Sequence, residues 1–155
     1  MDALLLAVER LALGVVAAGG LVMAAAVRPL LLAAQSPGSD PSVATAVEKI
    51  SVGAWNRYNR LALIAALLLA ATEFTRLLAG GRFATFYLSG SLVMAALLAV
   101  KLRVDASLAA RSRSGADATR GGTGSDLDRT HKIVELLSAP VLVIAGVLML
   151  LPIPG

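Results

Sequence analysis

The sequence predicts an all-α integral membrane protein: a four-transmembrane-helix bundle with a short interfacial amphipathic helix before the second span. The first observation is composition. Of 155 residues, 57% are hydrophobic and 15% charged, with a mean hydropathy of +0.80, whereas a soluble domain has about 25% charged residues. The second observation is that apolar residues are gathered into runs. Their length is close to the ~20 helical residues that span about 30 Å of hydrocarbon. We expect one membrane domain over residues 1–155.

The first span is expected at about residues 8–34. An uncharged run covers residues 11–27 and resumes after Arg28 and Pro29. The acidic residues Asp2 and Glu9 disfavour a cleaved signal peptide, which needs a basic start. Residues 35–42 are rich in Pro, Gly and Ser and predict a loop.

The remaining elements follow in order. Apolar residues recur at helical spacing from Val43 to Tyr58, which predicts the interfacial helix. The second span is expected at about 58–79, a short turn follows, and the third helix is expected at 83–111. Residues 112–125 predict a flexible polar loop. The fourth span is expected at 126–151, with Ser125 as its N-cap and a kink at Pro140.

The distribution of basic residues predicts the orientation. Four spans place both termini on one side, with three Lys or Arg residues there and eleven on the other side, among them Lys101. Loops rich in Lys and Arg stay cytoplasmic. We therefore expect a bacterial inner (cytoplasmic) membrane protein with both termini outside and both long loops inside. The basic loops should also attract anionic lipid headgroups, and we expect no nucleic acid as a partner.

Small residues predict how the helices pack, because lipid provides no hydrophobic drive for association. Ala62, Ala66 and Ala70 form a small-residue row on the second span. On the first span, one face is expected to point into the bundle; its residues are Gly14, Ala17, Leu21, Ala24 and Arg28.

Polar residues on the fourth helix form the most specific constellation. They share one face at helical spacing: Asp128, His131, Glu135 and Ser138. A His and a carboxylate one turn apart suit a metal ion, and intramembrane ionisable groups often handle protons. We favour a structural polar cluster over both alternatives.

Four of the polar residues are expected to converge at the inner end of the bundle: Arg28, Asn59, His131 and Glu135. Arg28 is the expected partner of Glu135, because an unpaired charge in the membrane is costly. A second polar set lies at the outer end, where exposed interfacial pairing is the favoured interpretation; its members are Glu9, Arg10, Glu73 and Arg76.

Composition excludes several classes of chemistry. The chain has no cysteine and one histidine, so disulfides, thiol catalysis and cysteine-ligated metals are excluded. One chain cannot supply two axial histidines to a haem. No phosphate loop or nucleophile elbow is present. We therefore expect no catalytic residues, no metal and no cofactor.

Four short motifs resemble the transmembrane protein 205-like family: AVRPLL from residue 26, WNRYNRL from residue 55, KLRVDASLAA from residue 101 and DRTHKIVELLS from residue 128. The resemblance covers about residues 5–151 and implies a four-helix membrane domain of unknown function. The sequence departs from the family after the histidine, where Lys132, Val134 and Ser138 stand at positions commonly held by glycine, serine and asparagine.

Three functions remain open. The favoured one is a small non-enzymatic membrane protein, a structural or partner-binding subunit of a membrane assembly. The first alternative is transport of, or tolerance to, a small solute or metal ion. The second is a cofactor-binding protein that acts as an oligomer. A transporter needs polar groups near mid-membrane or a broken helix, and the sequence suggests only Pro140 and Ser138.

Overall fold

The computed structural model describes residues 2–34, 40–81, 83–113 and 124–151, and over these ranges it is helical with no strand. The elements are α1 (Asp2–Val22), a π-helical turn η1 (Met23–Val27), α2 (Arg28–Ala34), α3 (Pro41–Leu78), α4 (Ala84–Arg113) and α5 (Gly124–Leu150). Within these ranges, three segments are long and apolar enough to cross a membrane: Ala3–Leu30, Gly53–Leu78 and Ala84–Ser107. A shorter apolar stretch covers Leu137–Leu150. The predicted all-helical class is confirmed.

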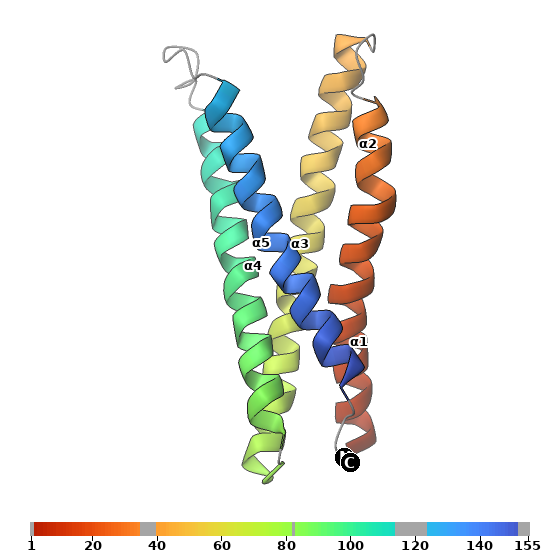
Figure 1. Cartoon of the computed structure of the whole chain (residues 1–155), viewed down its shortest axis with the longest axis vertical. Helices are drawn as coiled ribbons and strands as arrows, with labels where there is room; N and C mark the ends of the chain where they lie inside the picture. The colour runs from red at the N-terminus through yellow and green to blue at the C-terminus, as the bar shows by residue number, and fades with distance from the viewer. Residues whose placement is uncertain (1, 35–39, 82, 114–123, 152–155) are drawn as a thin grey trace.

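The helices form a bundle that is tight at one end and splayed at the other (Figure 1). Helix α3 packs against α1 and α4, and α5 packs against α4 and α1, so the contacts close into a ring. Figure 1 shows α5 crossing diagonally from α4 at the splayed end to α1 at the tight end. Helix α1 begins and α5 ends at the tight end, where the α3–α4 turn also lies.

Helices α1, η1 and α2 follow one another without a gap and form the first rod. This rod continues through Pro29 because the wider turn η1 precedes that residue. Proline lacks an N–H, and its ring clashes with the carbonyl four residues earlier. In η1 the Arg28 N–H bonds to the Met23 carbonyl, five residues back. Such a π-turn relieves the crowding without ending the rod. The predicted first span at 8–34 therefore lies in one rod that starts at Asp2.

Helix α3 corrects the prediction of a separate interfacial helix. It runs unbroken for 38 residues, or about 57 Å, and includes the amphipathic stretch from Val43 to Tyr58. No Pro interrupts it after its first residue, Pro41. Asp40 caps it by accepting from the Ser42 N–H at 2.8 Å and from the Ser42 hydroxyl at 2.7 Å. These hydrogen bonds lower the pKa of the exposed Asp40 carboxyl.

Glycine ends α3, and α5 continues past Pro140. Gly80 has φ +83°, a conformation suited to glycine, and the Gly81 N–H closes the turn on the Arg76 carbonyl at 3.0 Å. Helix α4 then extends to Arg113, and α5 begins at Gly124, so both enter the stretch predicted as a loop. The predicted Ser125 cap falls on side chains outside those described, and α5 continues through Pro140.

The core confirms one predicted helix face and corrects another. Ala62, Ala66 and Ala70 are buried as expected. The first rod, however, does not turn its predicted face inward: Leu21 is 63% exposed, and Ala24 and Arg28 are exposed. Its buried residues are Glu9, Ala12, Leu13, Val16 and Gly20. Hydropathy cannot separate a lipid-facing from a helix-facing side when both are apolar.

Leu148 should carry more stability than its neighbour Leu150. Leu148 is 1% exposed and packs beside Gly90, whereas Leu150 is 87% exposed. We expect Leu148→Ala to lower the free energy of unfolding by about 2–5 kcal/mol through the cavity that it leaves. Leu150→Ala is the matched control, with little effect. Thermal unfolding in detergent measures both, and equal losses would contradict this packing.

Candidate functional site

Lys101 is a buried lysine inside the bundle. Its residue is 4% exposed. The ammonium Nζ donates a hydrogen bond to Ser138 Oγ on α5 at 2.6 Å and lies 5.0 Å from the centroid of the Trp55 ring on α3, within the range of a cation–π interaction. The sequence placed Lys101 among the loop cations beyond the third span. The structure instead places it between three helices.

Asn59 is the second polar group at this place. It is fully buried on α3, and neither its Nδ2 nor its Oδ1 has a hydrogen-bond partner among the described atoms. The Asp105 carboxyl lies near both Lys101 and Asn59 but completes no hydrogen bond with the amide. Buried polar groups are nearly always paired, and leaving one unpaired costs about 1–3 kcal/mol. The unpaired Asn59 amide is therefore a candidate binding group.

A cavity of about 50 Å³ joins these groups. That volume holds about four water positions. Polar groups and rings from α3, α4 and α5 form part of its wall, and small and aliphatic residues complete it: Gly20, Ala24, Trp55, Tyr58, Asn59, Leu98, Lys101, Ser138, Val141 and Leu142. The arrangement suits a small ligand with a polar end and a short apolar part.

Two glycines of α1 allow the wall of this cavity to form. A Cβ at Gly19 would lie 2.8 Å from the Tyr58 ring, and a Cβ at Gly20 would clash with Leu142 and lie 2.6 Å from Tyr58 Oη. The close approach lets Tyr58 Oη donate to the Val16 carbonyl at 2.7 Å. This bond holds α3 against α1 beside the cavity.

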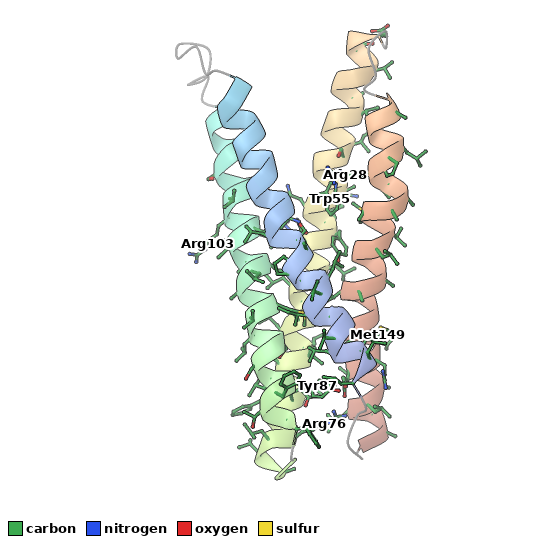
Figure 2. All side chains as sticks on the ribbon, in the orientation of Figure 1. Arg28, Trp55, Arg76, Tyr87, Arg103 and Met149 are labelled. Carbon is green, nitrogen blue, oxygen red and sulfur yellow. The ribbon has the colours of Figure 1, made fainter. Side chains whose placement is uncertain are left out.

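Of the predicted inner cluster, Asn59 takes part in the cavity. Arg28 is exposed on α2, and Figure 2 shows it at about the height of Trp55, toward the splayed end. Sequence reasoning missed Lys101 and Trp55. A usable signal was present, because Trp55 and Asn59 are four residues apart and share one face of a helix.

The other predicted residues lie on α5. The side chains of His131 and Glu135 are outside those described, so their convergence with Arg28 and Asn59 stays a prediction, and the Asp128 side chain is likewise outside. Ser138, from the same predicted face, is half-buried and accepts from Lys101. Among the described residues, no group of three His, Cys, Asp or Glu side chains is placed to hold a metal ion.

The two carboxylates of the polar set at the tight end are buried, whereas Arg76 is half-buried and Arg10 exposed. This corrects the interpretation of the set as exposed pairing. Glu9 and Glu73 are 0% and 1% exposed. Arg76 Nη1 donates to Glu9 Oε2 at 2.5 Å and to Glu73 Oε1 at 3.0 Å. Arg10 instead donates to the Met149 carbonyl at 3.3 Å. One guanidinium therefore joins α1 to α3 at the tight end, where Figure 2 places Arg76 near Tyr87.

Comparison of the chain with protein-family models, curated proteins and solved structures gives no match. The resemblance to the transmembrane protein 205-like family therefore stays a prediction based on its four motifs.

Removing Arg76 should destabilise the bundle strongly. Arg76→Met leaves two buried carboxylates without the guanidinium that contacts both, and breaking a buried pair from one side costs about 3–5 kcal/mol. Arg103→Met is the control, since Arg103 is exposed and points away from the other helices in Figure 2; surface changes usually stay within about 0.5 kcal/mol. Thermal unfolding in detergent compares the two, and similar losses would argue against the buried network.

Proposed function

We propose that this chain is a non-enzymatic, four-span integral membrane protein that binds a small solute between its helices, as a small-solute transporter does. The observation that carries the proposal is the cavity that joins buried Lys101 to the unpaired Asn59 amide. A transporter needs polar groups inside the bundle or a broken helix. Lys101 and Asn59 provide buried polar groups.

Exposed apolar side chains support membrane insertion. Large aliphatic side chains face outward from three helices, including Leu11, Leu61, Ile64, Leu92 and Val93. Water disfavours so much contiguous apolar surface, whereas hydrocarbon accepts it. The helical backbone satisfies its own hydrogen bonds, as a spanning segment must. The apolar stretch Leu137–Leu150 is short for a span. Local thinning of the bilayer and snorkelling of flanking polar side chains toward the interface accommodate such a stretch.

The proposed orientation keeps the tight end outside the cell. Lys101 is buried and no longer counts as a loop cation, yet ten basic residues remain on the cytoplasmic side against three. A reporter fused after Gly155 should therefore be periplasmic, and one inserted at Gly122 cytoplasmic. Accessibility of both reporters in intact cells makes the measurement, and the opposite pattern at both sites would reverse the orientation.

Solute binding is tested by a variant that lacks the unpaired amide of the cavity. Asn59→Leu replaces the unpaired amide by an apolar group of similar size, which should raise the thermal stability of the ligand-free protein because no buried polar group is left unpaired. Wild type and variant are then screened by thermal shift against small anions, cations and neutral solutes. We expect at least one solute class to stabilise the wild type and not the variant. Identical responses to every solute would contradict the proposal.

The second candidate is the structural or partner-binding subunit. An outward-facing apolar groove between α1 and α3 supports it, lined by Val8, Leu11, Ala12, Val15, Leu61, Ile64, Ala65 and Leu68. Such a groove suits the apolar face of another transmembrane helix, since packing rather than water drives association in lipid. Ile64→Trp, which fills the groove, should reduce the particle mass of the detergent-extracted protein. An unchanged mass would count against this candidate.

A further inference from the structure

We propose that the solute is a small carboxylate, bound with its oxygens on Lys101 Nζ and Asn59 Nδ2 and its short carbon chain against the apolar wall. This inference rests on the proposed function and specifies the ligand class of the same cavity.

The charge of Lys101 favours an anion. Among the described residues, no ion pair within 4.0 Å joins Lys101 to a carboxylate; Asp105 acts on it from a greater distance on the same helix. An ammonium has three N–H donors, and one of them is used by Ser138. A buried charge is stable when it is paired and hydrogen-bonded. A ligand carboxylate supplies both the counter-charge and the missing acceptors.

The Asn59 amide favours a carboxylate over a spherical anion. A carboxylate has two oxygens, so one can accept from Lys101 while the other accepts from Asn59 Nδ2. A halide has a single centre and leaves the amide less well satisfied. Asn59 Oδ1 is an acceptor that also lacks a partner, and a hydroxyl next to the carboxylate would donate to it. We therefore expect a 2-hydroxy carboxylate to bind more tightly than the unsubstituted acid.

The size of the cavity favours a short chain. About 50 Å³ holds about four water-sized positions, which leaves room beside the carboxylate for a short carbon chain at most. The wall also has apolar side chains, with Leu98, Val141 and Leu142 from two helices. A carboxylate of this kind comes either from a short water-soluble acid or from the head of a fatty acid whose tail extends into lipid. The chemistry at Lys101 and Asn59 is the same for both.

The test uses the purified full-length chain in a neutral detergent. Isothermal titration is run with acetate, lactate, chloride, methylammonium and dodecanoate, all at constant ionic strength. We expect lactate to bind more tightly than acetate, and chloride and methylammonium to show no saturable binding. If dodecanoate binds and the short acids do not, the natural ligand is the carboxylate head of a fatty acid. If the short acids bind, it is a soluble one. Either result supports the proposal when it depends on Lys101.

Three variants test whether carboxylate binding depends on Lys101 and Asn59. Lys101→Met removes the charge and keeps the length, and Asn59→Leu removes the amide; each should weaken carboxylate binding about ten-fold or more, the value of a charge-assisted hydrogen bond. Arg103→Met, which removes an exposed cation two residues along α4, should leave affinity unchanged. If Lys101→Met fails to fold, Lys101→Arg replaces it, because this change keeps the charge but alters its shape. The loss of carboxylate affinity in Asn59→Leu then decides whether the site exists.

The outcomes separate this inference from the proposed function. A solute of another class that binds in an Asn59-dependent manner, with no carboxylate binding, overturns the carboxylate and leaves the solute-binding function standing. No binding of any solute overturns both. Equal weakening by Lys101→Met and Arg103→Met would show a general charge effect and overturns the carboxylate site.

Discussion

The fold depends on where polar side chains can be buried in a chain that is apolar on nearly every face. Three contacts between helices carry this constraint. Arg76 joins Glu9 of α1 to α3, Tyr58 of α3 donates to the Val16 carbonyl of α1, and Lys101 of α4 donates to Ser138 of α5. Each contact buries a donor and an acceptor together, so the helix faces that hold them must meet. Apolar packing then fills the space between.

The sequence predicted the helical class and the approximate positions of the elements, because composition and breakers decide these. Runs of apolar residues and the Gly80–Gly81 turn are local signals. The rotation of a helix about its axis depends on its neighbours in space, which local sequence does not reveal. In alanine-rich helices, hydropathy does not indicate which face points into the bundle. The expected inner face of the first rod, chosen from Gly14 and Ala24, was therefore wrong. Glu9 was the better marker, since a carboxylate avoids lipid whereas alanine is indifferent to it.

The site was missed for a related reason. A lysine at the end of an apolar run has two explanations, a topological cation or a buried group, and the sequence alone favours the first. Only the packing of Trp55, Asn59 and Ser138 around Lys101 distinguishes them. Asn59 breaks the rule that buried polar groups are paired, and departures from such rules concentrate at functional sites. The expected polar residue was thus found, but beside a different cation from the one expected.

The short turn between α3 and α4 has a consequence for the proposed insertion into a membrane. Helices joined by so few residues would enter a bilayer together, as one hairpin. Glu73 and Arg76 lie next to that turn on the same helix, three residues apart and in contact, so their ion pair needs no other helix. Glu9 instead meets its cation across helices, because Arg76 of α3 donates to it while the adjacent Arg10 donates to the Met149 carbonyl. The Glu9 carboxylate is therefore compensated only where α1 packs against this hairpin, which ties the position of α1 to that of α3.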